Sequence, residues 1–597
     1  TQFADEYSMQ SIVAGKRQKV VGHMTLPFSR GDSRARDLLI LCVAMAMAVG
    51  LLAAPPASAA VDDVHVIVGL SEDSAVEPAD LVRGVGGAVV RDLGISDSFS
   101  ALVPGDRVDD LLAHPDVLSV VEDGSLQILE DGWENATGIS ASLADNYAGS
   151  LESIIDKTID VDEFWDEEGY GKGVDVALID SGVVPVQGLA TSGKIINGPD
   201  LSFESQSDDL RYLDTYGHGT HLAGVIAGYD GSSSGFMGVA PGARIVNVKV
   251  ANYEGAVDVS QVIAAIDWVV QHRNDNGMNI RVINLAYGTD SVQSAQLDPL
   301  SFAVEQAWRA GIVVVVAAGN DGNSTALRNP ALNPYVIAVG ASDSNYTASP
   351  DNDYVAGFTN CGTKERYIDI LAPGRSIISL RNPGSTADVN YPEARIGDRF
   401  FLGSGTSQAS AVVAGAAALI VGAYPNATPD EVKAYLMADG KKVKTENKYC
   451  GVAPLINLNE LAYDGPEDLN YTLQSTSFRA LGTGSLEKAR GSHHVAVDGV
   501  VLQDEQDIFG QKWNAEVWAK YSANYMAWDG GDWNGTSWSG TSWSGTSWSG
   551  TSWSGTSWSG TSWSGTSWSD YVWGSASWNG TSWSGTSWSG TSWSGTS

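Results

Sequence analysis

Between about residues 131 and 464, short runs dense in valine and isoleucine alternate with stretches of helical periodicity. Four runs have the composition of strands buried on both faces, namely 173–180, 243–250, 281–286 and 311–318. Between them, apolar residues recur every three or four positions at 262–270 and 300–307, as on one face of a helix. Such alternation requires right-handed crossovers, so we predict an α/β fold with a doubly wound parallel sheet.

Two polar residues stand where chemistry collects in a sheet of this kind, beyond the carboxyl ends of its strands. Asp180 ends the first of the four runs, and Asn320 follows the last. Each alone is also an ordinary turn former. Their significance therefore depends on the partners elsewhere in the chain.

A glycine-rich turn, Gly403 to Gly405, leads into a long uncharged run that extends to Val421. This pattern predicts that Ser407 lies at the N-terminus of a buried helix, where unpaired N–H groups suit an anion beside a nucleophilic serine. The alternative is that Thr406 or Ser407 merely caps a core helix. The run is too short and glycine-broken to span a bilayer, which takes ~20 apolar residues.

His218 follows a glycine and precedes a helical pattern at 222–227. A serine hydroxyl becomes a good nucleophile only with an imidazole to take its proton and a carboxylate to orient that imidazole. Asp180, His218 and Ser407 supply these three groups. The alternative is a metal pair formed by His218 and His221, but no third ligand has zinc-like spacing, and we assign no metal.

Taken together, three motifs resemble the subtilisin family of serine peptidases: Ile179-Asp180-Ser181-Gly182, His218-Gly219-Thr220-His221 and Gly405-Thr406-Ser407. The resemblance covers about residues 160–460. It implies a seven-stranded parallel sheet and hydrolysis of peptide bonds through an acyl-enzyme. It also implies that Ser407 is the nucleophile, His218 the general base and then acid, Asp180 its orienting partner, and Asn320 an oxyanion donor.

The same resemblance implies a binding site for an extended protein or peptide substrate. Ala286, Tyr287 and Gly288 would pair with the substrate backbone and wall the first specificity pocket, together with Ala317 and Gly319. The stretch 250–255 would form the opposite edge, so that the substrate is read by strand addition. Asp321 either adds a preference for basic side chains or points to water.

This sequence departs from the family pattern behind the nucleophile and in one loop. Gln408 replaces the usual methionine, and 410–413 lacks the usual proline. The loop 228–238, where many relatives bind calcium, offers one carboxylate, Asp230, and several serines. That is a thin ligand set for a cation that takes 6 to 8 oxygens, so no cofactor is assigned and calcium stays an open alternative.

The N-terminal part predicts export and processing. A basic flank, an apolar core at 38–54 and an Ala-x-Ala site indicate a secretory signal within 1–59, cleaved after Ala59, with a retained anchor as the alternative. Because the sequence opens with Thr1, translation from Met24 is a further interpretation. Residues 60–130 predict a small α+β unit that resembles the inhibitory propeptide of secreted subtilisins, a tethered inhibitor that the enzyme removes itself.

The C-terminal part has two sections, a linker or small module at 466–527 and a repeat tail at 528–597. Tryptophan occurs at 513, 518 and every fifth residue from Trp528 to Trp593, mostly as Gly-Thr-Ser-Trp-Ser. A period of five fits neither a strand nor a helix. Two interpretations remain, a disordered chain or a solenoid whose side is one repeat long. Functionally the tail is either a tether to cell-wall glycan or a spacer without a specific ligand.

Composition limits the partners. With 71 acidic and 35 basic residues the formal charge is -36, which argues against nucleic acid. Cys42 lies in the predicted signal, leaving Cys361 and Cys450 either bonded or as two free thiols. We therefore expect a secreted, self-processed serine endopeptidase. If the tail binds glycan, we expect the enzyme to be associated with the cell wall. The alternative is a catalytically silent or merely self-processing fold that displays the tail as an adhesin.

Overall fold

The computed structural model describes residues 63–70, 76–92, 98–122, 132–458 and 478–533, the long ranges with short internal gaps, and a set of short strands between 543 and 590. The predicted signal segment, with its cleavage site after Ala59, lies outside the described residues.

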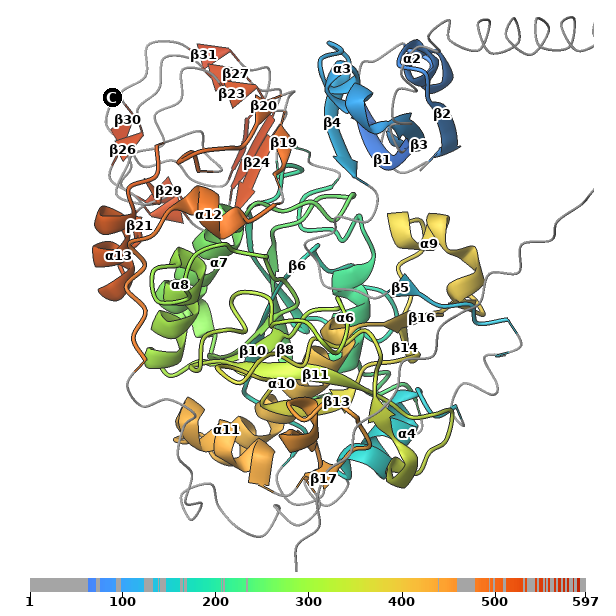
Figure 1. Cartoon of the computed structure of the whole chain (residues 1–597). Coiled ribbons are helices and arrows are strands. Elements are labelled where there is room, and N and C mark those ends of the chain that lie inside the picture. Colours follow the sequence, from blue (N-terminus) through green and yellow to red (C-terminus); the bar gives the residue numbers. More distant parts are fainter. Residues whose placement is uncertain are drawn as a thin grey trace, which may run out of the picture. The chain divides into compact units, whose positions relative to one another are not determined.

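A large sheet forms the centre of the molecule (Figure 1). Its order β7-β8-β6-β9-β10-β11-β13 contains seven strands, and every neighbouring pair in it is parallel. These strands are β6 (Asp175–Asp180), β7 (Ile195–Asp200), β8 (Arg244–Lys249), β9 (Ile280–Leu285), β10 (Val313–Ala317), β11 (Ile337–Asp343) and β13 (Ile370–Pro373). Short strands extend the edge: β12 (Tyr354–Val355), β17 (Lys441–Lys442) and β18 (Pro454–Leu455). The predicted α/β fold with its parallel sheet is confirmed.

Helices cover both faces of this sheet. α6 (His218–Ala227) and α10 (Thr406–Ala423) pack together, and α7 (Val259–His272) packs with α8 (Pro299–Arg309), while α11 (Pro429–Ala438) lies against α10. Asp258 caps α7 in a capping box with Gln261, and Asp298 caps α8 just before Pro299. Among the described residues, α10 is the one helix long and apolar enough to cross a membrane, but 89% of it is buried inside the protein. It is a core helix, as its glycine-broken sequence predicts.

A second, antiparallel sheet lies beside the turn that enters α10. It contains β14 (Ile377–Leu380), β15 (Arg395–Ile396), β16 (Phe400–Ser404) and β5 (Gly132–Trp133). The short helix α4 (Leu151–Ser153) lies against β14, and α9 (Thr386–Asn390) packs against the 3-10 turn Pro392–Ala394 that precedes β15. Because β16 runs straight into the turn before Ser407, whatever pairs with the end of β16 lies near Ser407.

Residues 63–122 form an α+β unit with its own core. Its antiparallel sheet has the order β2-β3-β1-β4. The elements are β1 (Asp63–Leu70), α2 (Pro78–Gly84), β2 (Ala88–Asp92), β3 (Ser98–Pro104), α3 (Val108–Leu112) and β4 (Val117–Glu122). Val66, Phe99 and Leu111 are among its fully buried side chains. The strands and α3 match the sequence pattern, whereas α2 was not expected.

The stretch 478–533, which contains most of the expected linker or small module (466–527) and the first residues of the expected tail, packs onto α7 and α8. It contains α12 (Leu486–Arg490), β19 (Ala496–Val497), β20 (Val500–Val501), α13 (Ala515–Ala523), β21 (Trp528–Asp529) and β22 (Asp532–Trp533). Asp267 of α7 accepts hydrogen bonds from the indoles of Trp518 (2.7 Å) and Trp533 (2.9 Å) and from the Ser522 hydroxyl (2.7 Å). Burial raises the pKa of Asp267 to about 6, against these bonds. The first tryptophans of the five-residue register are therefore anchors in the core.

The tail forms parallel strand pairs between residues twenty positions apart. Trp543 pairs with Trp563 and Trp563 with Trp583, and the pairs Trp548–Trp568, Trp553–Trp573 and Trp558–Trp578 have the same offset. The strands are β23 (Trp543–Ser544), β24 (Ser547–Gly550), β25 (Trp553–Ser554), β26 (Ser557–Trp558), β27 (Trp563–Ser564), β28 (Ser567–Asp570), β29 (Trp573–Gly574), β30 (Ser577–Trp578), β31 (Trp583–Ser584) and β32 (Trp588–Gly590). Twenty residues are four pentapeptides, so the described strand pairs have the spacing that the solenoid interpretation expects, one repeat to a side.

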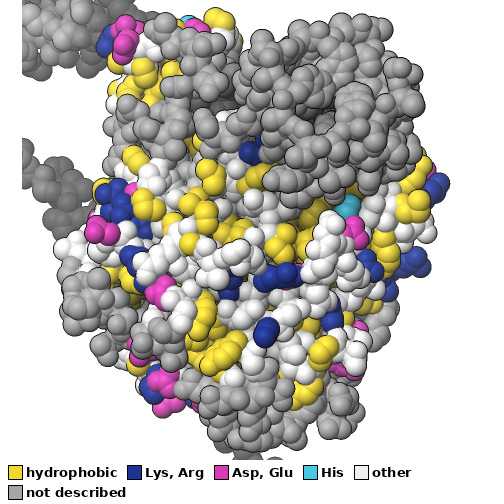
Figure 2. Space-filling view, turned by 180° about the vertical axis from the view of Figure 1, so that it is seen from behind, with side chains coloured by type: hydrophobic (Ala, Val, Ile, Leu, Met, Phe, Trp, Pro, Cys, Tyr) yellow, Lys and Arg dark blue, Asp and Glu magenta, His cyan; other side chains and the backbone are white. Residues whose placement is uncertain are grey.

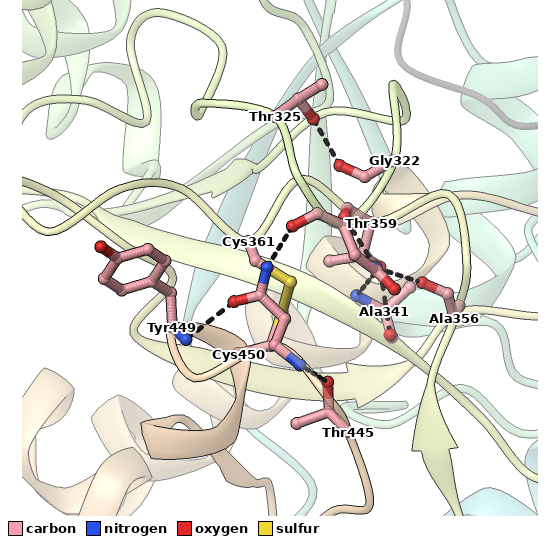
Figure 3. The surroundings of a disulfide bond; sticks show 11 residues. Gly322, Thr325, Ala341, Ala356, Thr359, Cys361, Thr445, Tyr449 and Cys450 are labelled. Atoms are coloured by element: carbon pink, nitrogen blue, oxygen red, sulfur yellow. Dashed lines mark hydrogen bonds between the residues drawn. A yellow bond between two sulfur atoms is a disulfide. The ribbon is translucent and has the colours of Figure 1, made fainter. Parts of the chain in front are cut away.

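Cys361 and Cys450 form a disulfide bond, which resolves the alternative left open by the sequence (Figure 3). Both residues are fully buried, and the bond joins positions 89 residues apart. It fastens the segment after β12 to the turn before β18, at one edge of the central sheet. Closing so long a loop stabilises the folded chain by about 4.6 kcal/mol in the chain-entropy account.

Candidate active site

Two of the predicted catalytic residues meet at the carboxyl end of β6. In the strand order of the sheet, β6 lies between β8 and β9, where the order along the chain reverses. Asp180 is its last residue, and Asp180 Oδ1 lies 2.8 Å from Nδ1 of His218, the first residue of α6. Both side chains are at most 1% exposed. A carboxylate at this distance can orient an imidazole for a proton transfer.

A second buried carboxylate, Asp214, holds the turns around this pair, and sequence reasoning missed it. Its oxygens accept hydrogen bonds from the Ser181 hydroxyl (2.7 Å) and from the backbone N–H groups of Gly217 (2.6 Å) and Thr220 (2.8 Å). Burial raises the pKa of Asp214, and these bonds oppose that rise. The available signal was an acidic residue four positions before His218.

The glycine after His218 is required by close packing. A Cβ added to Gly219 would lie 2.1 Å from the backbone oxygen of Gly182, the residue two after Asp180. The turn after β6 and the first turn of α6 therefore touch through their backbones. This close approach requires glycine at 219, whereas Gly182 has φ +110° and a Cβ there would lie 2.7 Å from the Leu213 backbone oxygen.

His221 lies on the same helix but points into the core. Its Nε2 is 3.2 Å from the Phe401 backbone oxygen, and its ring packs edge-on against Trp133 at a centroid distance of 5.3 Å. Burial, and next the nearby His218, lower the pKa of His221 to about 3. His221 is thus a neutral core residue in this structure.

Burial of His221 predicts acid sensitivity. The unfolded chain binds a proton at His221 below about pH 6.5, whereas the folded chain does so only near pH 3, so this residue makes stability fall as the pH drops through that window. We expect the difference in unfolding free energy between wild type and His221→Gln to shrink with a slope of about 1.4 kcal/mol per pH unit. Urea titrations at several pH values, in a Ser407→Ala background to prevent autolysis, measure it. Parallel curves would contradict the expectation.

Ser407 is the second residue of α10 and is fully buried. α10 packs against α6, which carries His218. The side-chain oxygen of Asn320 accepts hydrogen bonds from the backbone N–H (3.0 Å) and the hydroxyl (2.9 Å) of Thr406, the residue before Ser407. Among the described residues, the buried Nδ2 of Asn320 has no hydrogen-bond partner. That donor is free for an oxygen that develops negative charge beside Ser407.

Asn320→Ala is expected to lower kcat by a factor of about 100 to 1,000 and to change KM little, because the lost donor serves the oxyanion and not the bound substrate. Steady-state kinetics with a peptide p-nitroanilide measure both constants. Asn323→Ala is the matched control, since Asn323 lies three residues later and donates to the backbone oxygens of Ala356 and Thr359. Equal losses in the two variants would speak against an oxyanion role.

The predicted substrate-binding residues follow two neighbouring strand ends. Ala286, Tyr287 and Gly288 come directly after β9, and Ala317 and Gly319 end and follow β10. Ala286 and Tyr287 are buried, and burial raises the pKa of the Tyr287 hydroxyl well above its usual value. Gly319 has φ +116°, and a Cβ there would meet the Asn360 side chain at 2.6 Å. Because β9 and β10 pair in parallel, the two segments lie next to each other at the same end of this strand pair.

Two charged residues considered for binding already have basic partners. The Arg328 guanidinium donates to both oxygens of Asp321 (2.7 and 2.5 Å), so Asp321 is paired with a cation of its own chain. Asp230, the carboxylate of the loop at 228–238, accepts from Arg399 at 2.7 Å. A carboxylate held by arginine is a poor calcium ligand, and Ser232 to Ser234 lie outside the described residues.

Acidic and basic side chains do not form separate patches on the face shown in Figure 2. Acidic and basic side chains are interspersed there among hydrophobic and uncharged ones. The C-terminal stretch contains two adjacent histidines, His493 and His494. His494 Nε2 lies 2.8 Å from Glu487 Oε1, and this contact is exposed to solvent. Its neighbour His493 lies outside the described residues.

Comparison with known proteins agrees with this geometry. The model of the subtilase family matches residues 171–452. The chain is 43% identical to serine protease AprX of Bacillus subtilis over 286 residues, which cover 46% of this chain and 63% of that protein. It is 35% identical to subtilisin DY of Bacillus licheniformis (45% and 83% covered) and 30% identical to subtilisin E of Bacillus subtilis (66% and 90% covered). The first match thus spans less than two thirds of its relative.

Proposed function

Because the chain belongs to the subtilase family, and is by that kinship a serine-type endopeptidase, we propose that it cuts protein substrates through Ser407, His218 and Asp180. The observation that carries the assignment is the fully buried contact of 2.8 Å between Asp180 Oδ1 and His218 Nδ1. A buried carboxylate on an imidazole, beside the helix that begins with Thr406 and Ser407, suits general-base catalysis.

In the first half-reaction, the Ser407 hydroxyl oxygen bonds to the substrate carbonyl carbon while His218 Nε2 takes the hydroxyl proton. Asp180 holds the opposite ring nitrogen and stabilises the imidazolium that results. The carbonyl oxygen becomes an oxyanion, which accepts hydrogen bonds from Asn320 Nδ2 and the Ser407 N–H. The C–N bond then breaks, the leaving amine takes the proton from His218, and an acyl-enzyme remains.

In the second half-reaction, a water molecule takes the place of the leaving amine. His218 removes one of its protons as the oxygen bonds to the acyl carbon, and the oxyanion forms again in the same place. Release of the carboxylic acid returns the proton to Ser407. The two halves use the same three side chains and the same oxyanion donors.

We further propose that the enzyme is exported and made as a proenzyme. The signal pattern in 1–59 and the similarity to subtilisins support export. The separate core of the α+β unit at 63–122 supports a pro-segment that folds as a unit. The disulfide between Cys361 and Cys450 suits an oxidising compartment outside the cytoplasm.

The tail is proposed as a tether to cell-wall glycan, since regularly spaced aromatic side chains suit stacking on sugars. Pull-down of the isolated tail with purified cell wall tests this. Retention above that of a variant with its tryptophans changed to alanine is the expected result. Equal retention would leave the tail as a spacer.

Labelling with a fluorophosphonate probe tests the catalytic proposal. The secreted protein should be labelled at Ser407, and intact mass should show a chain shortened by the propeptide. A folded, shortened protein that is never labelled would favour the alternative function, display of the tail as an adhesin. The same preparation should hydrolyse casein before labelling and should no longer do so after labelling. This result would tie the activity to Ser407.

A further inference from the structure

The C-terminal stretch 478–533 contributes a buried arginine to the core. Arg490 is the last residue of α12, which lies beside α7 (Figure 1), and its side chain is fully buried. Arginine is almost never buried to this extent unless it is paired. Its Nε donates to Asp258 Oδ2 at 2.6 Å, and its other two nitrogens donate to the backbone oxygens of Asp504 (2.7 Å) and Gln506. Because Asp258 is buried as well, removing either charge would leave the other without compensation.

Asp258 lies just beyond the stretch 250–255, the expected edge for an extended substrate. This stretch begins beside the candidate catalytic site, since the N–H of Val250 donates to the Asp180 backbone oxygen at 2.8 Å. Beyond its other end, Asp258 caps α7 and accepts the hydrogen bond from Arg490. The expected edge is therefore held at one end by Asp180 and at the other by the ion pair.

The opposite expected edge includes Tyr287, and the same ion pair lies close to its hydroxyl. Burial raises the pKa of Tyr287 well above its usual value, Asp258 adds to this rise, and Arg490 opposes it. Both charges of the pair therefore act on this hydroxyl. A single ion pair, with its arginine from the C-terminal stretch, thus lies beside both expected edges.

The C-terminal stretch also holds the loop 289–298, which follows the second edge. Side chains of the loop bond to the stretch: Asp290 accepts from the N–H (2.8 Å) and the hydroxyl (2.6 Å) of Ser492, and Gln293 accepts from the Ser485 N–H (3.1 Å) and donates to the Ser485 backbone oxygen (2.8 Å). Gly491 has φ +73°, and a Cβ there would lie 1.9 Å from Asp290 Oδ1, so this close approach requires glycine. The loop and the C-terminal stretch are thus fastened together by side chains and by backbone packing.

These contacts come from outside the part of the chain that matches the family. The match ends at residue 452, whereas Ser485, Arg490 and Ser492 lie beyond it. Both expected substrate edges lie within the matched part. The stretch 478–533 is therefore an addition that reaches the ends of both edges.

We propose that Arg490 is a positioning residue for an extended peptide substrate: with the stretch 478–533 that carries it, it holds the two edges at the separation that a strand between them needs. This inference rests on the proposed function and deepens it. A strand that pairs with both edges lies about 4.8 Å from each, so a shift of either edge breaks hydrogen bonds to the substrate backbone. Arg490 acts through Asp258 and Tyr287 and not by contact with the substrate.

The substrate class follows from this arrangement. An extended peptide pairs with both edges along several residues, whereas a short peptide that reaches only the first specificity pocket gains little from their separation. The edges serve the acyl part of the substrate, because Ala286, Tyr287 and Gly288 are expected to wall the first specificity pocket. Loss of Arg490 should therefore weaken the reaction of substrates that are long on the acyl side and spare short ones.

Arg490→Met in the full secreted chain tests the inference. Values of kcat/KM are measured for two p-nitroanilides with the same residue next to the leaving group, one with that residue alone and one with several more on the acyl side. The ratio of the long to the short substrate should fall about tenfold, the size of a moderate contribution to binding. The KM of the long substrate should account for most of the fall, since the edges act on binding.

Arg366→Met is the matched control. Arg366 is buried and donates to both oxygens of Asp369 (2.8 and 2.6 Å), as Arg490 pairs with Asp258. This pair lies at the other end of the sheet, since Asp369 also accepts from the Ala338 N–H at the start of β11. Both variants break a buried ion pair and should unfold at a lower temperature, but only Arg490→Met should change the ratio.

An unchanged ratio in Arg490→Met, or an equal fall in Arg366→Met, would overturn the inference while the enzyme is still labelled by the fluorophosphonate at Ser407. Absence of labelling in the wild type and in every variant would overturn the proposed function and the inference with it. If Arg490→Met does not fold, Gln293→Ala removes the bonds to Ser485 and loosens the loop after the second edge. The ratio should again fall, and an unchanged ratio would count against the inference.

Discussion

Ser407→Ala is expected to lower peptide hydrolysis by about a millionfold and to leave the chain uncut. The substitution removes the oxygen that attacks the carbonyl carbon, and His218 and Asp180 then have no proton to move, so the whole catalytic unit fails together. A loss of this size is known for the equivalent change in a well-studied family member. Kinetics with a peptide p-nitroanilide and intact mass of protein made in a protease-free host measure the two effects.

Ser410→Ala is the matched control for this experiment. Ser410 lies one turn further along α10, is fully buried, and donates its hydroxyl to the Ser407 backbone oxygen at 2.8 Å. The variant loses a buried hydroxyl from the same helix and keeps the nucleophile, so it should mature and remain active. Normal processing of Ser407→Ala would show that another protease makes the cut and that self-cleavage is wrong.

Asp180→Asn is expected to reduce kcat by about 10,000-fold. An amide of the same shape keeps the packing at the end of β6 but removes the negative charge that faces His218 Nδ1 at 2.8 Å. It also allows the wrong imidazole tautomer, in which Nε2, the nitrogen proposed to take the Ser407 proton, already carries a proton. Because binding of substrate does not use this carboxylate, KM should change much less than kcat.

The opposite end of the same strand offers the control. Asp175 begins β6, is fully buried, and accepts two hydrogen bonds from Arg244 at 2.6 and 2.7 Å. Asp175→Asn should lower the unfolding temperature, since it leaves Arg244 with a weaker partner, and should leave kcat near the wild-type value. A comparable fall in kcat for both variants would show that β6 is simply sensitive to losing a carboxylate.

The strands that could be predicted are those with dense aliphatic runs, and burial alone was not enough. β11 and β13 are also entirely buried but were missed, because β11 contains Gly340 and Ser342 and β13 is four residues long and ends in Pro373. The strands β6 and β10 are entirely buried, and their runs of aliphatic residues predict this burial. β7 was not predicted, because it lies at the sheet edge, is partly exposed, and contains Gly198 and Pro199. An edge strand has one free side and needs no continuous apolar pattern.

The candidate site divides in a similar way. Asp180, His218, Asn320 and Ser407 could be predicted because each lies in a short motif that resembles a known one. Their expected roles await the experiments above. Asp214 and Arg490 were missed, because their roles depend on partners that only the folded chain brings near. Asp321 was considered for substrate binding because of its charge, but the sequence does not show that this charge is paired with Arg328.

The C-terminal tryptophans show where a repeat pattern misleads. Trp513 and Trp518 share the five-residue spacing of the tail, yet both are buried in the peptidase core. Spacing alone cannot separate them from the tail, because both sets have the same period. The difference lies in acceptors such as Asp267, which is 251 residues before Trp518.

In a coil of twenty residues, the number of repeats in the tail determines which side of the coil each repeat occupies. One pentapeptide is a quarter of a coil, so gain or loss of a single repeat would rotate all later repeats by a quarter turn about the solenoid axis. Gain or loss of four repeats would restore every tryptophan to its column. The irregular stretch from Asp570 to Asn579 keeps the five-residue spacing although its sequence differs. Because each pentapeptide contains one tryptophan, the four sides of such a coil are equivalent, so a tail can gain or lose single repeats and keep a tryptophan in every repeat of every side.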